Sequence, residues 1–171
     1  FGGQNVAVGN DLAEQGNLVG DNLAIDNGQA NQINNYGDNL AAHNDGVDQL
    51  NHEGDNVALD NGGVTVQTNH NGENTANDNN IVGQFNESGN NSGTDNGIVG
   101  QFNESGENNA TDNNVAIQDT QSGNNNAENN GVVGQANVDG ENNATGNDAA
   151  VQVNEYANNN AEDNVSAEQI N

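Results

Sequence analysis

Apolar and amide side chains recur at every second position in two short runs of this chain. In residues 98–114 the first run is Val-x-Gln-x-Asn, which ends at Asn103, and the second is Gly-x-Asn-x-Ala-x-Asp, from Gly106 to Asp112. A period of two is typical of a β-strand, in which alternate side chains share one face. No apolar stripe of helical period runs through these segments. The pattern therefore predicts two short strands separated by a turn.

The two runs repeat along the whole chain. Successive glutamines that mark the first run stand 17 residues apart, except for one gap of 18 between Gln49 and Gln67. A short fixed period indicates that neighbouring copies stack on one another. We therefore expect a single repeat domain over residues 1–171, with about ten copies of the unit. The marker residues are Gln15, Gln32, Gln49, Gln67, Gln84, Gln101, Gln118, Gln135, Gln152 and Gln169.

Two breaks in the alternation predict corners. The three-residue step from Asn103 to Gly106 interrupts the period of two at a glycine, which a sharp corner needs. An Asp-Asn pair, followed by Gly or Asn, closes most units and makes the second corner. Each unit then reads as strand, turn, strand and turn, which is one rung of an all-β solenoid with two short strands per rung.

The recurring residues of each unit are expected to face inward, the closing Asp included, so that each lies on its own copy in the next rung. Only 30% of the residues are hydrophobic, so amides must supply much of the interior. Low hydrophobicity and high charge are also typical of disordered chains. Strict positional repetition favours a fold, because an in-register stack pairs buried amides. The predicted inward ladders include Gln84, Asn86, Asn91, Gln101, Asn103 and Asn108.

The charge balance excludes several functions. The chain has 26 Asp and Glu residues and no Lys or Arg, so nothing neutralises the phosphates of a nucleic acid. Insertion into a membrane is not expected, and the lack of Cys removes thiol chemistry. No nucleophile, base and orienting group stand out from the repeat background, so we expect no catalytic residues and no enzyme. The chain opens at Phe1, which indicates a processed, secreted product.

Carboxylates recur in two rows. One row directly follows the glycine of the first corner, which we call the Gly site, and the other is the closing Asp. Like charges stacked about 5 Å apart repel one another unless a cation bridges them. Ca²⁺ suits such oxygen-rich rows, and the alternative is a solvated acidic face in high salt. His52 and His70 read as surface turn residues one rung apart. The candidate calcium ligands are Asp21, Asp38, Asp55, Asp60, Asp78, Asp95 and Asp112.

The two ends of the chain fit together in the repeat pattern. Residues 166–171 are a first strand without its second, residues 1–12 are a second strand without its first, and complete repeats fill about 13–165. Contacts of this head-to-tail kind generate filaments, here with roughly 48 Å per subunit. The alternative is a monomer with frayed ends. The predicted polymer interface comprises Gly3, Asn5, Ala7, Asn10, Ala167, Gln169 and Asn171.

Two outward features suggest further contacts. An apolar strip confined to the first third of the chain predicts lateral packing against another filament or an anchoring surface. Phe85 and Phe102 occupy the same place in consecutive units and predict a stabilising aromatic ladder. The residues of the apolar strip are Leu23, Ile25, Leu40, Val57 and Leu59.

The unit Gln-x-Asn-x-x-Gly-x-Asn-x-Ala resembles the curlin repeat of bacterial surface amyloids, as in Gln101–Ala110. That family's unit has Gly in place of the first Asn and is somewhat longer. The resemblance implies an exported subunit that polymerises into cell-surface or biofilm fibres. Two alternatives remain open. One is a soluble calcium-binding module of an adhesin, and the other is an ice-binding solenoid, for which Thr94, Thr111 and Thr145 are scattered.

Overall fold

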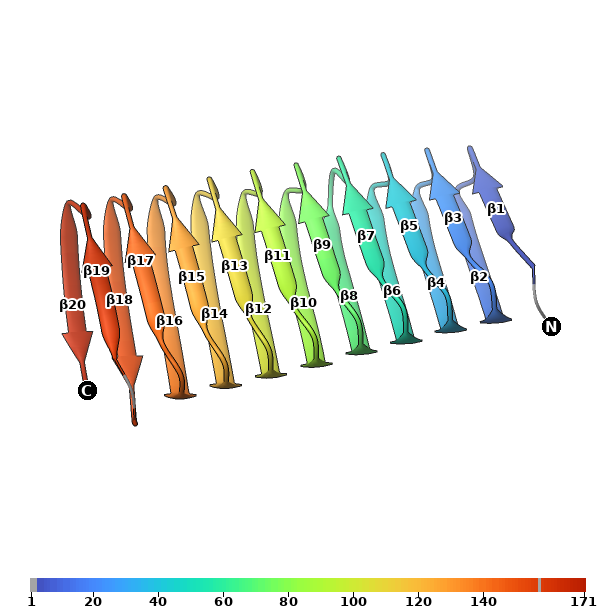
Figure 1. Cartoon of the computed structure of the whole chain (residues 1–171). Helices are drawn as coiled ribbons and strands as arrows, with labels where there is room; N and C mark the ends of the chain where they lie inside the picture. Colours follow the sequence, from blue (N-terminus) through green and yellow to red (C-terminus); the bar gives the residue numbers. More distant parts are fainter. Residues whose placement is uncertain (1–2, 157) are drawn as a thin grey trace.

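A computed structural model of the protein describes residues 3–156 and 158–171. Its twenty described strands alternate between a long and a short type along the chain (Figure 1). The long strands are β2 (Leu12–Val19), β4 (Gln29–Tyr36), β6 (Gly46–Glu53), β8 (Val64–Asn71), β10 (Ile81–Ser88), β12 (Ile98–Ser105), β14 (Val115–Ser122), β16 (Val132–Asp139), β18 (Ala149–Asn154) and β20 (Ser166–Ile170). The short strands are β1 (Asn5–Val8), β3 (Asn22–Ile25), β5 (Asn39–Ala42), β7 (Asn56–Leu59), β9 (Asn74–Asn77), β11 (Asn91–Thr94), β13 (Asn108–Thr111), β15 (Asn125–Glu128), β17 (Asn142–Thr145) and β19 (Asn159–Glu162).

The strands form two parallel sheets that face each other. One sheet contains the ten long strands in chain order, and the other contains the ten short strands. Each residue pairs with its own copy in the next rung, as Gln84 does with Gln101 and Asn91 with Asn108. The predicted β-solenoid of about ten rungs with two strands per rung is therefore confirmed. Among the residues described, no helix is long and apolar enough to cross a membrane.

The interior consists of small apolar columns between columns of amides. The second residue of most long strands and the third of most short ones are Ala or Val, and they form the apolar core, for example Val99 and Ala110. The fourth residue of each long strand is Gln, and six of these glutamines are among the largest fully buried side chains: Gln32, Gln49, Gln67, Gln84, Gln118 and Gln152. Amides are tolerated at this depth because stacked copies satisfy one another's hydrogen bonds.

The Gly site forms the first corner, as predicted. Glycines there have φ values of 123° to 148°, a region that L side chains rarely adopt. A Cβ atom at Gly106 would lie 1.9 Å from the carbonyl oxygen of Gly89 in the preceding rung. Glycine is therefore required both by its dihedral angle and by the close approach of two backbones. In the last unit this site is Ala157, which lies outside the described residues.

The closing Asp points outward, so the expectation that it faces inward is wrong. These residues have φ values of 52° to 56°, in the left-handed region, and their side chains are exposed. A left-handed residue resets the strand alternation, and the next residue, such as Asn61 or Asn96, is buried instead. Burying a row of carboxylates would cost far more than burying amides that pair. The left-handed residues are Asp26, His43, Asp60, Asp78, Asp95, Asp112, Asn129 and Asp163.

The single 18-residue unit keeps the register of both sheets. Its extra residue lies in the Gly62–Gly63 turn between β7 and β8. Gln49 still pairs with Gln67 and Asn56 with Asn74 on either side of that turn. The turn therefore absorbs the insertion, and the ladders continue without a break.

Candidate polymer interface

The glutamine ladder has a direction. The Nε2 atom of Gln101 donates to the Oε1 atom of Gln84 at 2.9 Å, and its own Oε1 accepts from Nε2 of Gln118 at 2.9 Å. Every later Gln of the column, from Gln32 to Gln169, donates to the Gln before it in the same way, so the ladder donates toward the N-terminal end of the stack. The ladder must consequently finish in an unused donor at one end and an unused acceptor at the other.

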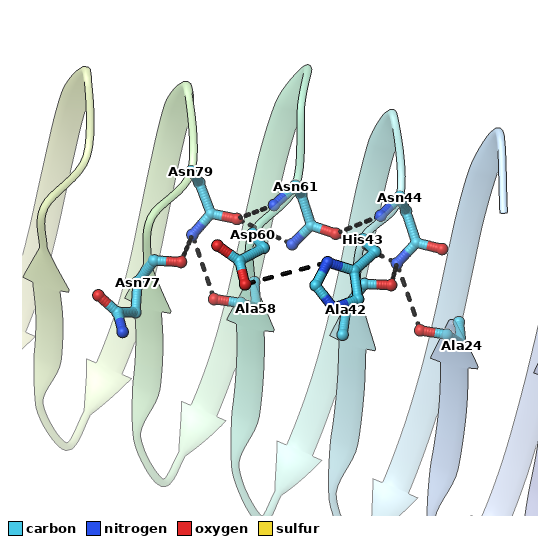
Figure 2. A network of polar contacts seen from close by, with 9 residues as sticks. All are labelled: Ala24, Ala42, His43, Asn44, Ala58, Asp60, Asn61, Asn77 and Asn79. Atoms are coloured by element: carbon cyan, nitrogen blue, oxygen red, sulfur yellow. Dashed lines mark hydrogen bonds and ion pairs between the residues drawn. The ribbon is translucent and has the colours of Figure 1, made fainter. Parts of the chain in front are cut away.

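Two asparagine ladders run in the opposite direction. The Nδ2 atom of Asn91, at the start of β11, donates to Oδ1 of Asn108 at 2.9 Å. The second ladder follows the left-handed residue. There the backbone N and the Nδ2 of Asn61 donate to Oδ1 of Asn79, at 3.0 and 2.8 Å (Figure 2). Both ladders donate toward the C-terminal end.

Asn86 and Asn103 face inward as predicted, but their side chains do not bond to each other. The Nδ2 atom of Asn103 donates to the carbonyl oxygens of Gly89 and Glu107, at 2.7 and 3.1 Å. Its Oδ1 atom is buried and has no hydrogen-bond partner among the described residues, as is also true of Asn86. This column therefore connects the long strand to the Gly corner, because the Nδ2 groups donate to carbonyl oxygens of the corner and not to the Asn of the next rung.

The N-terminal end of the stack presents β1 without a long strand before it. Asn5 donates through Nδ2 to Asn22 at 3.0 Å, and Asn10 donates through N and Nδ2 to Asn27. The Oδ1 atoms of Asn5 and Asn10 therefore stand at the open acceptor ends of the two Asn ladders. Gln15 is the first Gln of its ladder, and its Nε2 donates only to the carbonyl of Leu23, at 2.9 Å. Gly3 and Asn10 are exposed, and Ala7 is half-buried.

The C-terminal end presents β20 without a short strand after it. Nε2 of Gln169 donates to Oε1 of Gln152 at 2.9 Å, which leaves Oε1 of Gln169 at the open end of its ladder. Nδ2 of Asn159 donates to Oδ1 of Asn171 at 2.6 Å, a contact that replaces the missing Asn of a further rung. Ala167, Gln169 and Asn171 are exposed. The strands that hold or adjoin the predicted interface residues, β1 and β20, lie at opposite ends of the stack (Figure 1).

The carboxylates after the Gly site have a structural contact of their own. An Oδ1 atom of Asp38 accepts from the backbone N of Asp55 at 2.9 Å, and Asp55 accepts in the same way from Glu73. Asp21 accepts from the backbone N of Asp38 at 3.2 Å. No group of three acidic or histidine side chains suited to a metal ion occurs within residues 3–156 and 158–171. Calcium binding by the two Asp rows stays a prediction.

The other row, at the closing Asp, lies on the outer side of the second corner. His43 occupies this position in one rung, and its Nδ1 atom lies 3.9 Å from Oδ2 of Asp60 in the next (Figure 2). Both side chains are more than half exposed, so the contact contributes little to stability. The left-handed backbone here explains the choice of residues, since Asp and Asn tolerate that conformation better than most others.

Replacing Asp38 by Asn should stabilise the solenoid by a few tenths of a kcal/mol in low salt. Asn90 and Asn124 occupy the same site in later rungs, and their Oδ1 atoms accept the same backbone bond at 3.0 Å. The Asp38→Asn change keeps that acceptor and removes repulsion from Asp21 and Asp55. Urea unfolding in chelator at low and high salt measures the gain, which should shrink with salt. If calcium bridges this row, added calcium must stabilise the parent more than the variant.

The outward face of the long-strand sheet carries histidines and aromatic residues. His52 and His70 lie near the ends of β6 and β8 rather than in a turn, and their rings stack at 4.8 Å. Nδ1 of His70 also contacts the carboxylate of Glu87. Phe85 and Phe102 lie next to each other, as the aromatic ladder predicts, with ring centroids 4.9 Å apart and ring planes tilted by 31°.

The apolar strip predicted for lateral contact lies on the outward face of three adjacent short strands. Leu23 pairs with Leu40 and then Val57, while Ile25 and Leu59 flank Ala42. These side chains are half-buried. The strip extends onto β1, where Val6 and Val8 are more exposed. Lateral packing through this strip stays a prediction.

Comparison with protein-family models, with curated proteins and with solved structures found no match for the chain. The similarity to curlin repeats therefore remains one of residue pattern.

Proposed function

We propose that the protein is the structural subunit of a filament that grows by head-to-tail completion of a solenoid rung. The observation that supports this most directly is the direction of the three ladders. One ladder leaves a donor at the N-terminal end and an acceptor at the C-terminal end, and the other two do the reverse. The two ends of one molecule are therefore complementary in hydrogen bonding.

Docking places β1 of the following subunit beside β19, and β2 of that subunit beside β20. Oε1 of Gln169 then accepts from Gln15 of the following subunit, and Oδ1 of its Asn5 replaces Asn171 as the acceptor for Asn159. Oδ1 of Asn10 of the following subunit accepts from Asn164. Within one subunit, Oδ1 of Asn164 accepts in the same way from N and Nδ2 of Asn147, at 2.8 and 2.9 Å. The sheet register continues through the junction, because β20 supplies the long strand and β1 the short strand of one rung.

The same contact removes the exposed strand edges at both ends. An open parallel edge presents unpaired backbone groups and readily pairs with another strand. Because the two edges belong to different surfaces, the contact is heterologous and does not close on itself, so it continues as a filament. Repulsion among 26 carboxylates per subunit opposes growth, and elongation should consequently accelerate with ionic strength.

We place this filament outside the cell, as a fibre of a surface or matrix. The sequence offers no Lys or Arg at which trypsin-like proteases cut, which suits a polymer left among secreted enzymes. The buried amide stack supports the same role, since in-register ladders of this kind give cross-β fibres their stability.

Electron microscopy of the purified 171-residue chain, with and without a calcium chelator, tests the proposal. We expect long filaments with a rung spacing near 4.8 Å and a subunit step of roughly 48 Å. Loss of these filaments in chelator would add calcium to the interface. Discrete particles in every condition would reject the filament and favour the soluble calcium-binding module.

Replacing Ala167 by Asp should abolish filaments while leaving the subunit folded. Ala167 is exposed at the open end, but docking would place it in the column of Ala150, which is 2% exposed. An unpaired carboxylate buried there costs several kcal/mol, or roughly a thousandfold in elongation affinity. Pelleting assays measure the filament fraction, and circular dichroism checks the fold.

Ile170→Asp is the matched control for this change. It adds the same charge to the same strand, but at a position that faces outward and is 50% exposed. Filaments should form from this variant at nearly the parental yield. Equal loss of filaments in both variants would show that added charge, rather than burial at the junction, is responsible.

A further inference from the structure

A broad uncharged area lies on the outward face of the long-strand sheet. It consists of the first, third and fifth residues of the six long strands from β8 to β18, and we call it the neutral face. Of its eighteen positions only Asp119 is charged, although the chain carries 26 acidic residues. Most of the other carboxylates lie at the two corners of the rung, on either side of this face.

The neutral face has protrusions and hollows in neighbouring columns. Phe85 and Phe102 stand in the fifth-residue column, and Phe85 is 54% exposed. Gly83 and Gly100 occupy the third-residue column of the same strands. A Cβ atom at Gly83 would meet nothing within 4 Å, and one at Gly100 would meet only a carbonyl oxygen at 3.9 Å. Two aromatic rings therefore stand beside two open hollows.

We propose that two filaments pair through their neutral faces, related by a two-fold axis parallel to the solenoid axis. This inference rests on the proposed filament. If the axis follows the Gln84–Gln101 column, the fifth residue of each strand faces the third residue of the partner strand. Each Phe85 ring then enters the hollow at Gly83 of the partner, and Phe102 does the same at Gly100. The contact is isologous, so it closes after two filaments.

The occupant is a second copy of this chain, because the two-fold axis matches its Phe column to its Gly column. A second copy is repelled at the acidic corners but meets no like charge across most of the neutral face. In this pairing Glu87 and Glu104 face Ile81 and Ile98 of the partner at the rim of the contact, where water and salt can screen the carboxylates. Dry, interdigitated contacts between neutral sheet faces are the usual way in which cross-β sheets pair.

The size of the face predicts that pairing depends on polymerisation. Six rungs and five residues of strand width give on the order of 500 Å² per subunit, below the roughly 800 Å² per partner of a stable complex. Isolated subunits should therefore associate weakly through this face. In a filament the contacts add along the axis, so two filaments should pair firmly.

Mass per length of unstained filaments tests the proposal. A single solenoid should give about 3.7 kDa per nm, because 17.6 kDa occupies roughly 48 Å, and a pair should give about twice that value. Filaments of the parent should be pairs, and those of Phe85→Asp/Phe102→Asp should be single. The control Thr94→Asp/Thr111→Asp adds the same charges to the outward face of the short-strand sheet and should leave the pairs intact.

Cross-linking locates the contact independently of filament width. The chain has no Cys, so Val66→Cys and Thr68→Cys each supply one thiol, at third and fifth positions of β8 that the pairing brings together. A short bismaleimide should join the two variants in a mixture, and the Phe85→Asp/Phe102→Asp background should abolish the product. Thr94→Cys should give no more than background cross-linking.

The outcomes separate this inference from the filament itself. Single parental filaments, or pairs that persist in Phe85→Asp/Phe102→Asp, would overturn the pairing while leaving the filament in place. If no filament forms, cross-linking between soluble Val66→Cys and Thr68→Cys subunits tests the pairing. Absence of that cross-link then overturns the pairing together with the filament. Asp119→Ala should tighten the pairs, since it removes the one charge of the face.

Discussion

A single methyl group at Gly106 is expected to destabilise the solenoid by about 3 kcal/mol or more. Gly106 has a φ of 138°, and an added Cβ would lie 1.9 Å from the carbonyl oxygen of Gly89 and 2.8 Å from its carbon. Both contacts are to backbone, so no side chain can move aside to relieve them. The preceding rung would have to shift away at Gly89, and with it the hydrogen bond from Gly89 N to Ser105 O.

Gly134→Ala provides the matched control. Gly134 lies within β16 on the outward side, has no left-handed dihedral angle, and its added Cβ would meet nothing within 4 Å. Alanine should be neutral there or stabilise by about 0.5 kcal/mol, because it restricts the unfolded chain. Chemical unfolding followed by circular dichroism compares the two midpoints with that of the parent. Similar midpoints for both variants would mean that the corner can relax, contrary to the geometry.

The periodicity of the sequence was sufficient to predict the rung, its two strands and its Gly corner. These features follow from spacing alone, since alternation defines a strand face and a step of three residues to Gly, repeated in successive units, marks a turn. The inward Gln and the first Asn of the short strand were predicted for the same reason. The structure shows each of them paired with its own copy, as Gln101 is with Gln84.

The second corner was predicted with the wrong residue inward, because spacing cannot reveal a left-handed dihedral angle. The sequence did contain a signal. Asn follows the closing position in every described rung, whereas the closing position itself varies among Asp, His43, Asn129, Gly9 and Gly146. Asp, His, Asn and Gly are the residues that tolerate φ near +55°. The Asn that does not vary is therefore the buried residue, and the closing position that does vary is the left-handed turn residue.

The column of Asn86 and Asn103 shows a second limit of pattern reasoning. Repetition predicted that these residues face inward, which they do. It did not predict that their Nδ2 atoms would bind corner carbonyls and leave Oδ1 unpaired, because that choice depends on distances within the corner. The exception in this column, Thr120, instead donates to Oδ1 of Asn125 at 2.6 Å.

Replacing Gln101 by Glu should cost several kcal/mol at neutral pH and much less in acid. Nε2 of Gln101 donates to Gln84 Oε1 at 2.9 Å and to the carbonyl of Asn109 at 2.8 Å, and the side chain is 3% exposed. An ionised Glu would bring a carboxylate oxygen against these two acceptors with no hydrogen between them. A protonated Glu restores one donor and carries no charge.

The sign of the pH effect follows from this geometry. Burial and the two facing oxygens favour the neutral form, so the pKa of the introduced carboxyl is raised in the folded state above its unfolded value of about 4.3. The destabilisation is then complete above the folded pKa and disappears as the pH falls toward the unfolded value. Subtracting the parent at each pH removes the contribution of the native carboxylates, which titrate in both proteins.

Gln121→Glu isolates the effect of burial in this experiment. Gln121 lies in β14, three residues after a ladder glutamine, and its side chain faces solvent. The same change there adds the same charge without entering the stack, so unfolding midpoints should nearly match the parent at pH 7 and pH 4.5. A Gln101→Glu penalty that did not shrink in acid would mean that lost hydrogen bonding, rather than the buried charge, limits stability. A full recovery in acid would show that a protonated carboxyl can replace the amide as the donor within the Gln ladder. The direction of donation along that ladder would then be the property on which both the fold and the filament junction depend.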